Sequence, residues 1–295
     1  MKNNENGSDA ILYKKENQFK EIWRRFRKSK GAVIGLILFI VIAGGLLAAD
    51  LIVPYEKAVS QNFGARLAPP SMEYPFGTDG YGRDAFARLL HGGRTSLSIA
   101  LLATFSSAII GSSLGAIAGF FGGKVDNLIM RSLDIFMSVP DILFTMAVVY
   151  ALGPSFTNLL IALTLAYFTN YVRLVRSQVL NLAEQDYVEA ARAGGAKNAR
   201  IIISHIIPNA IGVIIVNTTL NVAKIILYES TLSFLGLGMP PPHPEWGLML
   251  AEAREFMRTA PWLMFFPSAA IVFTAASINL IGDGMRDALD PHLKS

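Results

Sequence analysis

Long stretches without a charged side chain are the main feature of the sequence. Asp, Glu, Lys and Arg are absent from three runs, which extend from Gly31 to Ala49, from Thr95 to Gly123 and from Ile142 to Val172. A membrane-spanning helix needs about 20 mostly apolar residues, because the hydrocarbon core is about 30 Å thick and every backbone polar group inside it must be hydrogen bonded. The pattern therefore predicts helices that cross a membrane.

The third run is long enough for two helices. Gly153 and Pro154 interrupt it with a turn signal, and apolar sequence typical of helices lies on both sides. We therefore expect a hairpin of two spans, the first of which begins near Leu133. Two further spans are expected from about Ile207 to Leu227 and from about Pro261 to Ile281. The sequence thus predicts an all-α membrane protein with six transmembrane helices.

Composition and charge agree with a membrane location. Of the 295 residues, 52% are hydrophobic and 16% are charged, against roughly 25% charged in soluble domains, and the mean hydropathy is +0.42. The net charge of +4 could indicate a nucleic-acid partner, but with both termini in the cytoplasm 18 of the 26 Lys and Arg residues fall inside and 7 outside. Short cytoplasmic loops are enriched in these residues. The basic stretch FKEIWRRFRKSK before Gly31 therefore fits an interfacial anchor on membrane lipid, and no nucleic-acid partner is expected.

The polar segments divide the chain into four parts. We expect a basic cytoplasmic segment over residues 1–30, a first transmembrane helix over 31–53, an extracytoplasmic segment over 54–94 and a core with five transmembrane helices over 95–295. Within the core, residues 173–208 leave the membrane on the cytoplasmic side for longer than a connection between helices requires.

A ridge of small residues marks the second span. Gly111, Gly115 and Gly119 recur at every fourth position, which allows another helix to approach closely. We expect this ridge to serve helix packing.

The cytoplasmic segment 173–208 predicts two short helices. Small and apolar residues recur at helical spacing in the first of them, at Tyr187, Ala190, Ala191 and Gly194. The Gly194-Gly195 pair ends that helix. A face of Ala and Gly cannot form a pocket, but it allows the backbone of a partner protein to come close.

The same segment is similar to the EAA signature of the permeases of binding-protein-dependent ABC importers. That signature has EAA, three residues, Gly, nine residues and then I-x-L-P. Here His205 stands where Ile is usual and Ile207 replaces Leu, a form that resembles the peptide and nickel branch. The resemblance implies that the matching residues contact the ATP-hydrolysing subunit: Glu189, Ala190, Ala191, Gly195, His205 and Pro208.

Two other stretches resemble the same branch. Gly77-Thr78-Asp79, followed by Arg83-Asp84, is similar to the GTD-GRD block of the dipeptide, oligopeptide and nickel permeases, and the run from Leu232 to Leu250 is similar to their Pro-rich outer loop. The resemblance extends from about Phe19 to Pro291 and is closest to the second, or C-type, permease of a heterodimeric pair.

The resemblance also implies a transport complex. Its members would be this chain, a second related permease subunit, two ATP-binding subunits that carry ATP and Mg, and an extracytoplasmic substrate-binding protein, in the bacterial plasma (inner) membrane. Peptides are the expected substrate, and nickel or a metal chelate is the alternative. The one Gly-Lys pair, Gly123-Lys124, is followed by Val125, and Ala118 replaces the leading Gly of a P-loop. We therefore expect no enzymatic activity, cofactor or metal on this chain.

A polar stripe in the fifth span is the expected substrate path. Polar side chains inside a membrane usually face the bundle interior or water. Four of them recur on one helical face: Asn217, Asn221, Lys224 and Tyr228. The alternative is that Lys224 lies at the outer end and is neutralised by Glu229 without touching substrate.

A secondary transporter or a channel is the alternative class of protein, because six spans alone do not exclude it. The long cytoplasmic segment 173–208, which a channel does not need, and the lack of visible inverted repeats favour the ABC importer.

Overall fold

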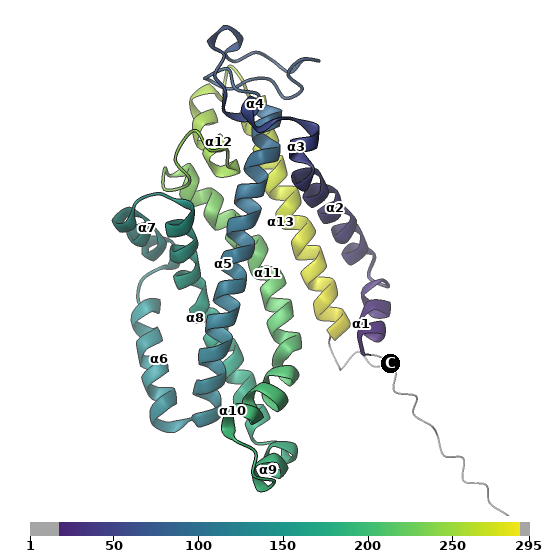
Figure 1. Ribbon diagram of the computed structural model, residues 1–295, viewed down its shortest axis with the longest axis vertical. Helices are drawn as coiled ribbons and strands as arrows, with labels where there is room; N and C mark the ends of the chain where they lie inside the picture. The colour runs from purple at the N-terminus through teal and green to yellow at the C-terminus, as the bar shows by residue number, and fades with distance from the viewer. Residues whose placement is uncertain (1–17, 290–295) are drawn as a thin grey trace, which may run out of the picture.

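The computed structural model describes residues 18–289, which include both long and short helices and no β-strand (Figure 1). The predicted all-α class is confirmed. The ends of the chain, for which the sequence predicts a cytoplasmic location, lie largely outside the described residues. The helices in chain order are α1 (Gln18–Phe26), α2 (Lys30–Leu47), α3 (Ala49–Ile52), α4 (Tyr55–Val59), η1 (Phe63–Ala65), α5 (Ala85–Phe121), α6 (Gly123–Met137), α7 (Asp141–Leu152), α8 (Phe156–Ala183), α9 (Asp186–Ala193), α10 (Asn198–Ile201), η2 (Ile202–Ile206), α11 (Ile207–Phe234), α12 (Trp246–Ala253), η3 (Arg254–Phe256) and α13 (Trp262–Leu289).

Five helical segments of the described chain are long and apolar enough to cross a membrane. They are α2, α5, α8, the continuous segment from α10 through α11, and α13. A sixth crossing would consist of α6 and α7 together, which are bent by 81° at the break between them. The predicted third span is therefore wrong as a single helix starting near Leu133. Pro140 explains the bend, because its ring and its missing N–H prevent an unbroken helix through this point.

The second membrane helix begins earlier than the apolar run predicts. α5 starts at Ala85 and not at Thr95, because Asp84 provides a cap. The Asp84 carboxylate accepts hydrogen bonds from the backbone N–H groups of Phe86 (2.9 Å) and Ala87 (3.2 Å). These bonds satisfy N–H groups that have no partner within the first turn of a helix. The block similar to GTD-GRD therefore leads directly into the membrane helix.

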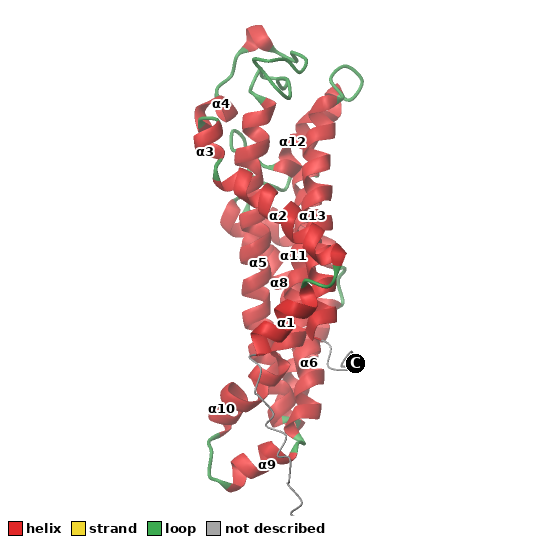
Figure 2. Cartoon of the chain, turned by 90° about the vertical axis from the view of Figure 1, so that its right-hand side faces the viewer, coloured by secondary structure: helices red, strands yellow, loops and turns green. Residues whose placement is uncertain are grey.

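The helices run along the long axis of an elongated bundle (Figure 2). α5 extends along most of the bundle, with α8 and α11 beside it, and α13 packs between α11 and α2 (Figure 1). α9 and α10 project at one end, which we call the α9 end, and α3, α4 and α12 lie at the other, the α12 end.

The glycine ridge of α5 packs against the backbone of α8, as the sequence predicts. A Cβ added at Gly115 would lie 2.5 Å from the carbonyl oxygen of Val172, and one added at Gly119 would lie 2.9 Å from that of Arg176. Real Cβ atoms do not approach other atoms so closely, so only Gly permits this separation of the two helices. The ridge therefore fixes the distance between α5 and α8 along the half of the bundle nearest the α9 end.

The substitution Gly115→Ala tests this packing. It should lower the free energy of unfolding by about 1–3 kcal/mol, because the added methyl group forces the two backbones apart. The measurement is the thermal denaturation midpoint of the purified protein in detergent. Gly44→Ala is the matched control, since a Cβ at Gly44 on α2 meets no atom within 4 Å. Equal midpoints for the two variants would contradict the role of the ridge.

Candidate functional site

A lobe at the α9 end, residues 184–206, is held to the bundle by apolar side chains. Val188, Ile201 and Ile206 are completely buried and belong to one core cluster with Phe120 of α5 and Val179 of α8. The guanidinium group of Arg192 lies over the ring of Phe120, 5.0 Å from its centroid. The lobe is therefore a fixed projection of the bundle.

The residues of the EAA pattern lie mainly on the outer surface of this lobe. Glu189, Ala190 and Gly195 are exposed, and so is Pro208 at the start of α11. Gly195 has φ +78, and a Cβ added there would meet no atom within 4 Å. Ala191 and His205 are half-buried. The lobe thus presents small side chains outward, together with the exposed Tyr187 and Ile203, and uses other large apolar side chains as its anchor.

The lobe continues into the membrane helix α11 without a break. α10, the π-helical turn η2 and α11 follow one another, so that one helical segment extends from Asn198 to Phe234. The backbone N–H of Ile207 donates to the carbonyl of Ile202, one residue farther back than in an α-helix. The wider turn lies immediately before Pro208, which has no N–H and could not form the regular bond. α11 therefore provides a direct mechanical connection from the lobe to the α12 end.

The structure places the four residues of the predicted polar stripe in different environments. Asn221 is buried, Asn217 and Tyr228 are half-buried, and Lys224 is exposed. The Asn217 side chain donates to the carbonyl of Val213 (3.3 Å) on its own helix. The ring of Tyr228 packs edge-on against that of Tyr167 on α8, with 5.4 Å between centroids. Among the four, Lys224 is the one whose side chain is directed mainly away from this chain.

The alternative in which Glu229 neutralises Lys224 is wrong. Lys224 forms no ion pair within residues 18–289. Glu229 is completely buried, and its carboxyl group accepts hydrogen bonds from Ser96 of α5 (3.2 Å) and Ser230 (3.3 Å). Because the two residues are five positions apart, they project from different faces of the helix.

The sequence did not indicate a groove of about 650 Å³ between α2, α5, α11 and α13. Most of its lining is apolar, and none of the four stripe residues contributes to it. Four hydroxyl groups do line it, from Ser112, Ser113, Thr218 and Thr219. The two Ser residues and the two Thr residues lie more than 100 positions apart in the sequence, so only the helix packing brings them together.

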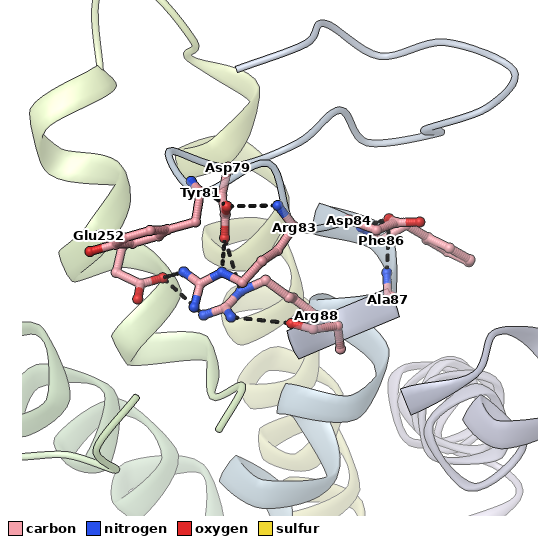
Figure 3. A network of polar contacts seen from close by, with 9 residues as sticks. Asp79, Tyr81, Arg83, Asp84, Phe86, Ala87, Arg88 and Glu252 are labelled. Atoms are coloured by element: carbon pink, nitrogen blue, oxygen red, sulfur yellow. Dashed lines mark hydrogen bonds and ion pairs between the residues drawn. The ribbon is translucent and has the colours of Figure 1, made fainter. Parts of the chain in front are cut away.

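A cluster of four charged residues lies at the α12 end (Figure 3). Glu252 of α12 accepts hydrogen bonds from Arg83 (2.7 Å) and Arg88 (2.9 Å) through the same oxygen, Oε2. Asp79 binds Nε of Arg83 at 2.6 Å and lies 3.4 Å from Nε of Arg88. The two Arg side chains are only 2% and 1% exposed. The cluster carries no net charge, and it ties the start of α5 to α12.

Local backbone geometry explains why the block similar to GTD-GRD forms this cluster. Gly82 has φ +73, and an added Cβ would overlap the backbone of Asn62. The Asp79 carboxylate accepts from the backbone N–H groups of Tyr81 (2.9 Å) and Arg83 (3.0 Å), which closes the turn. Burial by itself lowers the pKa of Arg83, but the adjacent Asp79 and Glu252 carboxylates raise it above its ordinary value. Arg83 therefore stays charged.

A pocket of about 470 Å³ lies beside the cluster and is lined by both charged and aromatic side chains. Asp79, Arg88 and Glu252 form part of its wall, with Tyr81 and Phe256. Sequence reasoning did not identify Glu252. In the sequence, Glu252 is only an acidic residue that follows an apolar stretch. Its partner Arg83 lies 169 positions away.

The fold is one found in transport proteins. It matches a chain of the MetNI methionine ABC transporter, solved in inward-facing conformations, with a TM-score of 0.57 and 19% sequence identity, over 69% of this chain and 96% of that one. The chain belongs to the family described as binding-protein-dependent transport system inner membrane component, whose model matches residues 111–295. A second model, the N-terminal TM domain of oligopeptide transport permease C, matches residues 17–70.

Characterised relatives match almost the whole chain. The dipeptide transport system permease protein DppC of Alkalihalophilus pseudofirmus is 43% identical over 96% of this chain and 93% of its own length. The oligopeptide transport system permease protein OppC of Bacillus subtilis is 38% identical over 99% of this chain and 95% of its own. The glutathione transport system permease protein GsiD of Pectobacterium atrosepticum is 38% identical over 94% and 92%.

The substitution Glu252→Gln tests the charged cluster. It leaves the buried Arg83 and Arg88 with one carboxylate between them, and removal of one partner from a buried ion network costs about 3–5 kcal/mol. We expect a lower thermal midpoint and easier proteolysis at the α12 end. Glu255→Gln is the matched control, because Glu255 is exposed on η3 and forms no ion pair within residues 18–289. An unchanged midpoint for Glu252→Gln would contradict the structural role of the cluster.

Proposed function

We propose that this chain is the second permease subunit of an ATP-driven importer that takes peptides from an extracytoplasmic binding protein. The observation that carries the proposal is the lobe at the α9 end, whose EAA residues are exposed on a fixed support that is continuous with a membrane helix. A channel does not need such a lobe. An importer driven by separate ATPase subunits needs one, because the chain has no P-loop of its own.

The relatives favour peptides as the transported substrate. Those cited above are named as dipeptide, oligopeptide and glutathione permeases, and all of these substrates are peptides. The nickel alternative has no such support. A binding protein that delivers the peptide and a second, related permease beside this one complete the membrane part of the proposed complex.

The distribution of exposed positive charge supports an orientation with the α9 end in the cytoplasm. The exposed basic residues there include Arg27 and Lys28 of the N-terminal segment and Lys197 and Arg200 of the lobe. At the α12 end the exposed basic residues are fewer, namely Lys57, Arg66, Arg254 and Arg258, and the buried Arg side chains are balanced by carboxylates within the cluster. Lys and Arg are enriched on the cytoplasmic side of bacterial membranes. The proposed location is therefore the bacterial plasma (inner) membrane, with both termini in the cytoplasm.

In this proposal the ATPase subunit binds the outer surface of the lobe. Glu189, Ala190 and Gly195 are exposed there, and small side chains permit close backbone contact. His205 and Pro208 lie where the lobe joins α11, so they would transmit movement rather than form the contact. ATP and Mg would be held by the two partner subunits. Closure of those subunits on ATP would move the lobe and α11 together and switch access from one side of the membrane to the other.

The substrate path is assigned to the face of α11 that carries Lys224. This exposed ammonium group has no ion-pair partner within residues 18–289, and a charge at membrane depth is costly unless it meets water or a charged partner. A path between the two permeases supplies both water and a charged partner. The partner is the terminal carboxylate of the peptide that passes through it. Asn217, Asn221 and Tyr228 line the neighbouring part of the same face in this assignment.

Co-purification tests the proposed complex. The tagged chain in mild detergent should recover a second permease and P-loop subunits, and a binding protein loaded with dipeptide should raise ATP hydrolysis. Ala190→Glu should abolish recovery of the ATPase subunits, because it places a charged side chain on the small outer face of α9.

Asn181→Glu is the matched control for that variant. Asn181 is exposed near the same end, but it lies on α8 and outside the lobe. Membrane insertion should be normal for both variants. Normal recovery of ATPase subunits with Ala190→Glu would contradict docking on the lobe, and recovery of this chain alone from wild-type cells would favour a channel or secondary transporter.

Uptake kinetics test the substrate path. Lys224→Met should reduce dipeptide uptake into proteoliposomes about tenfold, which corresponds to the loss of one hydrogen bond to a charged group. Lys57→Met is the control, because Lys57 is also exposed but lies on α4 at the α12 end. If uptake by Lys224→Met equals that of the control, Lys224 does not line the path.

A further inference from the structure

Two carboxyl groups meet in the interior near the α12 end. Glu229 lies on α11 and Glu245 immediately precedes α12, and both side chains belong to residues with 0% exposure. Ser96 of α5 connects the two positions, because its hydroxyl donates to Oε1 of Glu229 (3.2 Å) and accepts from the backbone N–H of Trp246 (3.3 Å), the residue after Glu245. No Lys, Arg or His forms an ion pair with either of them in the part of the chain that the structure describes.

The polar partners of the pair are too few for two negative charges. Glu229 accepts the two Ser hydroxyl bonds described above, and Oε2 of Glu245 accepts one bond from the backbone N–H of Met239 (3.0 Å). Oε1 of Glu245 and the hydroxyl of Ser233, both buried, have no hydrogen-bond partner. The site is also closed: a Cβ added at Gly92 would lie 2.9 Å from the backbone N of Glu245.

The charged and titratable side chains around the site are engaged elsewhere or directed away. His91 of α5 bonds the carbonyl of Val53 (2.9 Å), and Arg94 of α5 pairs with Asp50. The others on adjoining segments are Tyr228, which packs on Tyr167; Lys224, which is exposed; His243, whose Nδ1 lies 3.2 Å from the Tyr55 hydroxyl; Glu252, which binds Arg83 and Arg88; and Arg254, which lies over Phe234.

Relief of the repulsion must therefore come from a proton. Two ionised carboxylates buried at the same junction repel each other, and burial away from water makes each charge more costly still. One proton removes a charge and supplies a hydrogen-bond donor between the two groups. We propose that Glu229 and Glu245 share one proton, and that this proton fastens α12 to the membrane bundle.

The position of the pair gives the proton a structural role. Glu229 belongs to the helix that begins at the lobe, and Glu245 begins the helix that carries Glu252 of the charged cluster. Trp246 adds to the same junction, since its ring N–H donates to the carbonyl of Leu89 (2.9 Å). Loss of the proton would place two charges in contact at this junction and release α12 from α11. This inference does not depend on the transported substrate.

A cysteine reporter tests the proposal, because the chain contains no Cys. Ser233→Cys places a thiol at a site that is 1% exposed, next to Glu245, and Leu235→Cys places one at a site that is 53% exposed. The full chain of each variant is purified with its associated subunits and treated with a maleimide from pH 6 to pH 9. The labelling rate of the Ser233→Cys variant is divided by that of the Leu235→Cys variant, which removes the intrinsic pH dependence of the thiol.

The ratio should be low at pH 6 and should rise at alkaline pH, by up to about tenfold for each pH unit, since release of α12 is linked to loss of one proton. In Glu245→Gln the ratio should stay low at every pH, because a neutral amide replaces the protonated acid and also donates a hydrogen bond. Glu229→Gln should behave in the same way and provides a second, independent variant. Glu255→Gln, an exposed control, should keep the wild-type profile.

Three results would overturn the proposal. The first is a ratio that does not depend on pH in the wild-type background. The second is an alkaline rise that persists in both amide variants. The third is a reporter that is accessible at all pH values in both amide variants, since a pair without two adjacent negative charges should hold α12 in place.

Discussion

The backbone contact between α5 and α8 determines where the two ends of the molecule lie. Apolar side chains gain little by leaving lipid, because lipid tails are as apolar as Leu, so membrane helices associate through close packing. The glycine ridge supplies that packing by allowing the backbones to touch. α5 extends from the charged cluster, through Arg88, to the anchor of the lobe, through Phe120. A helix fixed along its length therefore keeps the cluster and the lobe at a constant separation.

Buried charged and ionisable side chains near the α12 end are stabilised in two different ways. In the charged cluster, Asp79 and Glu252 balance Arg83 and Arg88, and every ion has a partner of opposite sign. Such a cluster is insensitive to ordinary changes of pH, because Arg stays charged. The pair of Glu229 and Glu245 has no cation, so a proton must relieve the repulsion between its two carboxylates. The first arrangement therefore holds α12 permanently, whereas the second holds it only while the proton is bound.

The sequence predicted the features that depend on residues close to one another along the chain. Span number and approximate position follow from apolar length, and the glycine ridge and the lobe follow from short spacings. The bend at Pro140 was missed because the predicted span began near Leu133 and so placed Pro140 inside one helix. The partners of Glu229 and Arg83 were not predictable, because they lie 133 and 169 positions away and are selected by helix packing. Sequence proximity suggested Lys224 as the partner of Glu229, but five positions along a helix place two side chains on different faces.

α11 connects these parts into one mechanical unit. One end continues into the lobe through the π-helical turn before Pro208, and the end nearer α12 carries Glu229. A continuous helix transmits a displacement of one end to the other, because its backbone hydrogen bonds resist bending. Movement of the lobe must therefore act on the junction with α12, where the shared proton holds the two helices together. The strength of that junction decides whether α12 moves with α11 or separates from it. The carboxyl pair therefore controls whether a displacement of the lobe is transmitted to α12.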